Sequence, residues 1–484
     1  MKKQSEQIFE CITNIEDEFV DEALEERQSL KRLNLKPLLA AAACLALFAV
    51  GSAAISQTRT PKTENYQSYE GPVLPLTLRE KDSDIEAVRN TDFDFASYHS
   101  PENVQPFSTV TDQYQITNNN TSAKTVEFLY PFTGSYAKLS ELLPLIQKDG
   151  ESVSAELLAG NYTGDFLSDS LDDAESDAES YNLKSPENWK AYKELLEDGT
   201  YVENLFAPLK SLDMPVTVYR FDEETSGTSD HTDLVVDVTF HPEKTQILSY
   251  GFNGADFDDE NNSRTYRASI PQEASQILIV IGEDLDSFEI SKKDNKTGKS
   301  GLADRENVSR ETVTLTSILT EIEKEYMQIL TNGYGIKAEH YTEEMYDRSV
   351  AQMLTEYGVL SSREIIRYSG AVLEDILSDV FQQKRVFYLK FTLELQPSSE
   401  TEIAITLQKP YSHNFSCSSK DESHGYDLIT RAGSNLTFTE QNASLTNTET
   451  ITIPDQNFGF TPDQNTKSIP LDLTKEHYYL KIRQ

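Results

Sequence analysis

Near the start of the chain, apolar residues follow a helical period. Five of them recur at spacings of four, three, four and four residues, with acidic residues at most positions between: Ile8, Ile12, Ile15, Phe19 and Ala23. Residues three and four apart share one face of an α-helix. The pattern therefore predicts an amphipathic helix whose apolar stripe binds a groove in another protein. Self-association, or a loosely ordered helix beside a membrane, is the alternative for so short a helix.

A second pattern follows directly, in the form of an uncharged apolar run of nineteen residues from Pro37 to Ile55. At about 1.5 Å per residue, a helix of this length spans about 28 Å, close to the thickness of a bilayer core. Three basic residues precede the run and two follow it: Lys31, Arg32, Lys36, Arg59 and Lys62. Positive charge accumulates on the cytoplasmic side, so we expect one membrane-spanning helix with the N-terminus inside and the C-terminal part outside the cell.

Two other interpretations of the apolar run are weaker. The small residues Ser52 to Ala54 would suit cleavage of a signal peptide, but the preceding segment is acidic and about twice the usual length. Ala41 to Cys44 resembles a lipid-attachment motif, although the apolar run before Cys44 is short for one. An uncleaved membrane anchor is therefore the preferred interpretation.

Beyond a polar stalk, the pattern becomes that of β-strands. In residues 385–395, every second residue from Phe387 to Leu395 is apolar and the residues between are Tyr388, Lys390, Thr392 and Glu394, which is typical of a strand with one buried face. Residues 277–281 are all apolar, which indicates a strand buried on both faces. A turn cluster at residues 118–121 ahead of the alternating residues 124–132 predicts a hairpin at the edge of a sandwich. From residue 310 to 383 the spacing becomes helical, and it predicts three or four helices.

These patterns predict a mainly β ectodomain of immunoglobulin-like β-sandwich modules with a helical insertion, preceded by a cytoplasmic amphipathic helix and one transmembrane helix. An acidic low-complexity run at residues 165–180 separates two β regions. The predicted division is a cytoplasmic tail at 1–36, a transmembrane helix at 37–56, a linker at 57–70, a first β-sandwich module at 71–181, a second β module at 182–300, a helical insertion at 301–384, and a C-terminal β region at 385–484 that packs with the second module.

Net charge excludes one class of partner. The 484 residues carry a formal net charge of -38, and residues 1–36 account for little of it, with nine acidic and six basic side chains. Such a chain repels nucleic acids and anionic membrane surfaces. Solubility is the simplest explanation for the acidity, and binding of cations or of a basic partner is the alternative.

Cysteine usage points to a compartment. The three cysteines are Cys11, Cys44 and Cys417, so no disulfide can form within the predicted ectodomain. A long exported region without disulfides is unlike most animal secreted proteins and is typical of a bacterial envelope. We therefore expect a protein of a Gram-positive type of bacterium.

Motifs for catalysis are missing. The chain has no Gly-x-Ser-x-Gly elbow, no phosphate-binding glycine loop and no His-Glu-x-x-His pair. Cys417 and His424 are better explained as a lone thiol and an unrelated imidazole than as a nucleophile and its base. We expect no enzyme activity, no cofactor and no metal site. Calcium binding by the acidic loop from Asp256 to Glu260 stays open, because oxygen ligands at alternate positions could hold the ion, although the loop lacks the glycine and the distant glutamate of an EF-hand.

The tail carries a family likeness. Residues 12–23, ITNIEDEFVDEA, with the basic residues and alanine-rich helix after them, resemble the N-terminus of poorly characterised single-pass membrane proteins of Firmicutes. Some of those are described as anti-sigma-factor-like. Weaker similarity follows in YPFTGSY (130–136), GEDL (282–285) and NFGF (457–460). Unlike many anti-sigma factors, this tail has Cys11 and no histidine, so it lacks a zinc cluster before the membrane helix.

The resemblance implies a cytoplasmic partner, for which a sigma factor is the candidate, and an outside domain that senses an envelope ligand. The expected function is therefore that of a membrane-anchored regulator acting through its tail. A cell-surface binding or structural protein without signalling is the alternative.

Overall fold

The computed structural model describes residues 68–97, 107–163, 188–196, 205, 211–221, 232–258, 261–270, 275–294, 300–302, 308–334, 340–356, 359–360, 372–413, 424–461 and 468–483. The predicted tail, membrane helix and linker up to residue 67 lie outside these residues, as do all five residues of the apolar stripe. Within the described ranges, no helix combines the length and the apolarity needed to cross a membrane.

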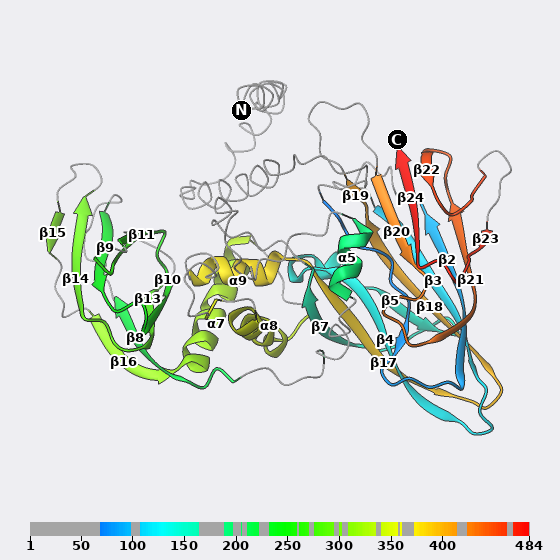
Figure 1. The fold of residues 1–484 in the computed structure, drawn as a ribbon, viewed down its shortest axis with the longest axis horizontal. Coiled ribbons are helices and arrows are strands. Elements are labelled where there is room, and N and C mark those ends of the chain that lie inside the picture. The colour runs from blue at the N-terminus through cyan, green and yellow to red at the C-terminus, as the bar shows by residue number, and fades with distance from the viewer. Residues whose placement is uncertain are drawn as a thin grey trace.

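The described residues form two β bodies with a layer of helices between them (Figure 1). The first body contains strands from residues 77–162 and 385–483, and the second contains strands from residues 215–314. The chain is mainly β, as the alternating patterns predict.

In the described part of the chain, the first body has three sheets. One has the order β23 (Ser468–Pro470), β21 (Thr437–Thr446), β2 (Ile85–Asp94), β3 (Phe107–Asn118), β18 (Glu400–Pro410), β5 (Leu145–Lys148) and β6 (Glu151–Ser152). The next has the order β1 (Thr77–Leu78), β4 (Lys124–Gly134), β17 (Arg385–Leu395) and β7 (Glu156–Tyr162). The last has the order β19 (Ser412–His413), β20 (His424–Ile429), β24 (His477–Arg483) and β22 (Thr452–Gln456).

The C-terminal strands complete this first body. β17 pairs with β4 along its whole length, β18 pairs with β3, and β21 runs parallel to β2. The prediction that residues 385–484 pack with the second module is therefore wrong. The long alternating strands of residues 85–134 need partners of similar length for their backbone N–H and C=O groups, and β17 and β18 supply them.

The strand at residues 385–395 has the predicted bounds. The hairpin predicted around the turn at residues 118–121, in contrast, does not form. β3 and β4 belong to different sheets, and the turn between them leads from one sheet to the other. Asn118 fixes this turn by donating hydrogen bonds to the carbonyl oxygens of Ser122 and Leu395, each at 3.0 Å. β4 lies between β1 and β17 and is not an edge strand, which agrees with its buried residues from Phe128 to Phe132.

In the described residues, the second body consists of two antiparallel sheets over one core. Their orders are β10 (Thr245–Tyr250), β13 (Gln276–Gly282), β8 (Pro215–Phe221) and β16 (Val308–Thr314), and then β11 (Gly254–Asp258), β12 (Ser263–Ile270), β9 (Thr232–Thr239), β14 (Ser287–Asp294) and β15 (Ser300–Leu302). β13 confirms the prediction of a strand buried on both faces. Leu278 and Val280 point into the core of this body, whereas Ile277 and Ile279 join the hydrophobic cluster that includes the helices.

Three helices described between residues 315 and 382 form the helical layer: α7 (Leu315–Tyr334), α8 (Glu343–Glu356) and α9 (Leu373–Gln382). The predicted insertion at 301–384 begins too early, because β16 still belongs to the second body. The residues of β16 are largely exposed and polar, so the sequence of this strand lacks the alternation of buried and exposed residues that would predict it. Two short segments, η3 (Tyr136–Lys138) and α4 (Leu139–Leu142), follow β4 in the first body.

A buried ion pair lies at the centre of the first body. Arg89 of β2 binds Asp112 of β3 with two hydrogen bonds of 2.7 and 2.8 Å, and both side chains are fully buried. The remaining capacity of the carboxylate is taken by Thr91 at 2.7 Å and by the Tyr114 hydroxyl at 2.6 Å. Arg89 also donates to the carbonyl oxygen of Ile429 at 2.6 Å, which links the pair to β20. Removing one partner would leave an uncompensated buried charge.

We expect Asp112→Asn to lower the free energy of unfolding by about 3–5 kcal/mol, because Arg89 keeps its charge and loses its carboxylate. Urea unfolding followed by the fluorescence of the single tryptophan, Trp189, measures the change. Glu127→Gln is the control, since the Arg79–Glu127 pair is about one-third exposed and should contribute at most about 1 kcal/mol. Equal losses for the two variants would contradict a special role for the buried pair.

Candidate functional site

The chain enters the first body through the segment Ser68 to Leu74, which we call the entry segment. Ser68 exchanges two backbone hydrogen bonds with His413, at 3.1 and 3.0 Å. Further along, the Val73 N–H donates to Asp427 at 2.8 Å, and its carbonyl oxygen accepts from Ile429 at 3.0 Å. The entry segment, including residues 68–70 of the predicted linker, is thus built into the C-terminal sheet.

A charged cluster holds the entry segment at Glu70, and we call Glu70, Lys384 and Lys409 the Glu70 clamp. Lys384, between α9 and β17, donates to the Glu70 carboxylate at 2.8 Å, and the Ser68 hydroxyl donates to the same oxygen at 3.0 Å. Lys409, near the end of β18, donates to the Glu70 carbonyl oxygen at 2.7 Å. The Glu70 N–H in turn donates to the Ser412 hydroxyl at 2.9 Å. One residue of the entry segment therefore contacts both the C-terminal strands and the end of the helical layer.

Burial and charge act in opposite directions on this cluster. Burial by itself would raise the pKa of Glu70, but the charges of Lys384 and Lys409 hold it below its ordinary value of 4.5. Burial lowers the pKa of Lys409 to about 8, against the attraction of Glu70. Lys409 is 3% exposed, so it is a buried amine whose charge changes at mildly alkaline pH.

The turn after Glu70 requires glycine. Gly71 has a φ of +73°, and a Cβ at this position would lie 2.6 Å from the Thr133 hydroxyl oxygen. Thr133 in turn shares a 2.9 Å hydrogen bond with the Tyr192 hydroxyl. A side chain at position 71 would therefore displace the entry segment from the strand β4 that it passes.

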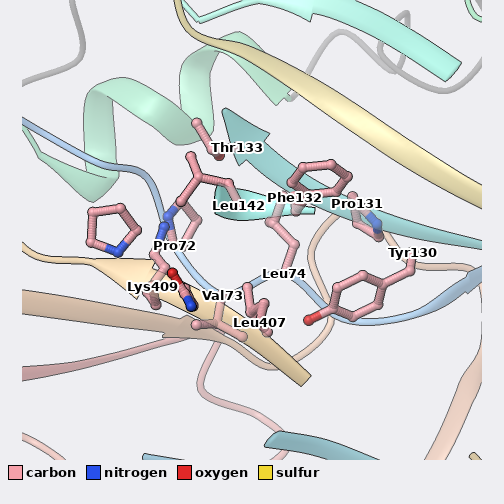
Figure 2. A pocket seen from close by; sticks show the side chains of 12 residues that line it. Pro72, Val73, Leu74, Tyr130, Pro131, Phe132, Thr133, Leu142, Leu407 and Lys409 are labelled. Carbon is pink, nitrogen blue, oxygen red and sulfur yellow. The ribbon is translucent and has the colours of Figure 1, made fainter. Parts of the chain in front are cut away.

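A small pocket adjoins the clamp, and Figure 2 shows its lining. Side chains of the entry segment, β4, α4 and β18 form its wall: Pro72, Val73, Leu74, Tyr130, Pro131, Phe132, Thr133, Leu142, Leu407, Gln408, Lys409 and Pro410. Its cavity volume is about 10 Å³, which is room for about one water molecule and far below the range of about 300–1,000 Å³ for sites of small organic ligands. The pocket is better suited to water than to a metabolite.

A second feature of the first body is a row of three half-buried rings, which we call the aromatic row: Trp189, His477 and Tyr479. Trp189 begins α5 (Trp189–Leu196) and stacks on His477, with ring centroids 5.3 Å apart. His477 stacks on Tyr479 at 6.2 Å, two residues along β24. Asp427 binds the His477 ring at 2.5 Å, and the Tyr479 hydroxyl donates to Asp455 at 3.2 Å, so carboxylates fix both rings.

The acidic loop that left calcium binding open is partly described. Asp256 forms an ion pair with Arg267 at 2.5 Å, and Asp258 accepts hydrogen bonds from Asn261, the shorter at 2.7 Å. Asp259 and Glu260 lie outside the described residues. Within the described residues, no three His, Cys, Asp or Glu side chains gather closely enough to hold a metal ion.

The other weak candidate from the sequence was Cys417 with His424. Cys417 lies outside the described residues, whereas His424 stacks on Tyr411 with ring centroids 3.6 Å apart. Burial lowers the pKa of His424 to about 4, so the imidazole is neutral at physiological pH and packs as an aromatic ring.

Sequence reasoning missed the Glu70 clamp. The polar residues before Glu70 place it in the predicted linker, and Lys384 is one of many charged residues and lies at a predicted boundary. A signal did exist for Lys409, which continues the inward positions Ile403, Ile405 and Leu407 of its strand. Searches against models of known protein families and against curated proteins found no match.

We expect Lys409→Met to change how stability depends on pH. The pKa of Lys409 lies below its ordinary value of 10.5, so between about pH 8 and pH 10.5 the unfolded chain binds more protons than the folded one. The wild-type free energy of unfolding should therefore rise relative to that of Lys409→Met across this window, by at most about 1.4 kcal/mol per pH unit. Urea unfolding at several pH values measures the difference.

Lys148→Met is the control for that comparison, because Lys148 lies in the same sheet and its side chain is 38% exposed. Its curve should stay parallel to that of the wild type. A curve for Lys409→Met that also stays parallel would show that Lys409 has an ordinary pKa and is not a buried amine.

Proposed function

We propose that this chain is a single-pass membrane-anchored regulator whose outer domain senses an envelope ligand and whose cytoplasmic tail binds a partner such as a sigma factor. The outer domain would consist of immunoglobulin-like β modules, and the two sheets of the second body, packed over one core, are in keeping with that. Support for the tail comes from the apolar stripe Ile8, Ile12, Ile15, Phe19 and Ala23.

The observation that carries this proposal is the Glu70 clamp. A linker that ended in a surface loop would leave the tail indifferent to the outer domain. Here the entry segment is fixed through Glu70 to Lys384 at the end of the helical layer and to Lys409 in β18. A displacement of the helical layer would therefore act on the segment that leads toward the membrane, which a transmembrane regulator requires.

A capture experiment tests the tail. Residues 1–36 on an affinity support should retain a specific cytoplasmic protein, and Ile15→Asp or Phe19→Asp should abolish its recovery because each puts a charge on the apolar stripe. Asp17→Asn is the matched control, since it changes a charge on the polar side and should keep the partner. Recovery that is insensitive to Ile15→Asp and Phe19→Asp, or no specific partner, would refute the proposal.

The aromatic row favours the second candidate function, a surface protein that binds cell-wall glycan without signalling. Ring faces stack on the apolar faces of sugars, and carboxylates such as Asp455 accept hydrogen bonds from hydroxyl groups. The net charge of -38 disfavours anionic wall polymers, so a peptidoglycan strand with few charges is the fitting ligand.

Binding of the full chain to purified peptidoglycan tests this second candidate. Trp189→Ala should weaken binding about tenfold, equivalent to about 1.4 kcal/mol. Lys190→Ala removes the exposed neighbour on α5 and should leave binding unchanged. Equal binding by the wild type and by Trp189→Ala would exclude the aromatic row as a glycan site.

A further inference from the structure

Two glutamates of the helical layer each have a carboxyl oxygen that is shielded from solvent. Glu323 of α7 is 5% exposed, and its Oε2 atom has no hydrogen-bond partner among the described residues. Glu374 of α9 is partly buried, and its Oε2 atom is likewise shielded from solvent without a partner. An ionised carboxylate in such a position would cost free energy, because its Oε2 atom would lack both water and a donor.

Glu323 faces another acid across the interface between α7 and α8. The titratable groups that act on it from α8 are Asp347 and Tyr346. Burial, together with a hydrogen bond to Asp347 and its charge, raises the pKa of Glu323 to about 10. Two negative charges here would repel each other with little water to screen them, so a proton on Glu323 favours the packing of α7 beside α8.

Glu374 ties α9 to the end of β10. Its Oε1 atom accepts a hydrogen bond from the N–H of Gly251, just after β10, and the backbone of Ser275, just before β13, lies directly beside Gly251. Ser275 donates through its N–H, at 2.7 Å, and through its hydroxyl, at 3.0 Å, to Glu325 of α7. Two carboxyl groups from different helices thus bind neighbouring backbone segments, at the end of β10 and the start of β13.

The neighbours of Glu374 oppose its ionisation. The titratable groups that face it are acids and a phenol: Glu325 from α7, Asp375 from α9 and Tyr250 from β10. Burial, only partly offset by the Gly251 N–H, raises the pKa of Glu374 to about 8, with a smaller contribution from the charges of Asp375 and Glu325. The Gly251 N–H itself favours the ionised carboxylate, so the burial of Glu374 and the acids around it are what keep the proton in place.

We propose that the helical layer is a proton-operated latch: Glu323 and Glu374 hold it closed while they are protonated, and alkaline pH opens it. Loss of either proton leaves a negative charge that is shielded from water and lies beside other acids, and the helices move apart so that water reaches the carboxylate. For Glu374 this displaces α9 from the second body, and for Glu323 it separates α8 from α7. Because α9 leads directly to Lys384 of the Glu70 clamp, opening would reach the entry segment. The biological role of the latch rests on the proposed regulatory function. Its chemistry, in contrast, requires no partner.

The sign of the pH effect follows from the raised pKa values. Between the ordinary glutamate pKa of 4.5 and the folded value of about 8 or 10, the closed state keeps a proton that the open state releases. The equilibrium constant for opening therefore rises about tenfold per pH unit for each proton released, and it levels off above the folded pKa.

Thiol labelling of the full chain, in a background of Cys11→Ser, Cys44→Ser and Cys417→Ser, measures this opening. Ile376→Cys reports on α9 and Met353→Cys on α8, since both native side chains are fully buried. Between pH 6 and pH 7.5, and after correction for the thiolate fraction, each labelling rate should rise about tenfold per pH unit. Glu374→Gln should flatten the rise at position 376, and Glu323→Gln the rise at position 353.

Ile405→Cys in β18 is the control, because this fully buried site opens only when the first body unfolds and should label far more slowly at every pH. The latch is refuted if the wild-type rates are flat, if the Gln variants keep their slopes, or if positions 376 and 405 label equally fast. The labelling rates depend on neither the tail nor a ligand. Capture by residues 1–36 can therefore fail while the latch is confirmed, and the latch can be refuted while capture succeeds.

Discussion

The buried pair of Arg89 and Asp112 is the interaction on which the rest of the first body depends. It joins adjacent strands of the largest sheet, and through the carbonyl oxygen of Ile429 it also binds the C-terminal sheet. Tyr114 extends it by accepting a hydrogen bond from the Leu76 N–H at 3.0 Å, just beyond the entry segment. An unpaired Arg89 or Asp112 in this buried site would cost several kcal/mol, so the pair fixes how β2 and β3 meet the C-terminal strand β20.

This arrangement makes the first body discontinuous. β7 and β17 pair directly, although the second body and the helical layer lie between them in sequence. Thr163 donates its N–H to the carbonyl oxygen of Lys384 at 2.9 Å, so the two ends of the insertion are held together at the clamp. Arg385, the next residue, is fully buried and contacts Ser349 of α8 at 2.8 Å, with its guanidinium over the Tyr162 ring. A movement of the second body or of the helical layer would therefore act on Lys384, which contacts the entry segment at Glu70.

Local pattern was a good guide to single strands and a poor one to their partners. The alternation in residues 385–395 predicts β17 with its observed bounds, and the continuous apolar run predicts a β13 buried on both faces. Neither pattern says that β17 pairs with β4, because that choice depends on strand length and on contacts hundreds of residues apart. The hairpin between β3 and β4 was wrong for the same reason.

The candidate site shows the same division. Arg89, Asp112 and Lys409 all occupy inward positions of alternating strands, so their burial could have been predicted, whereas their partners could not. Glu70 carried no signal at all, since a glutamate beside a polar stalk looks like part of the stalk. The apolar stripe of the tail remains a prediction from sequence, because residues 1–67 lie outside the described part of the chain.

Native-state hydrogen exchange at Val73 and Ile429 tests the central claim most directly, namely that the entry segment is part of the core. The Val73 N–H binds Asp427, and the Ile429 N–H binds Val73, so both amides should exchange only through global unfolding, like those of β2 and β3. Exchange at these two amides with a free energy several kcal/mol below the global value would show that the entry segment detaches by itself, and would contradict the coupling described above.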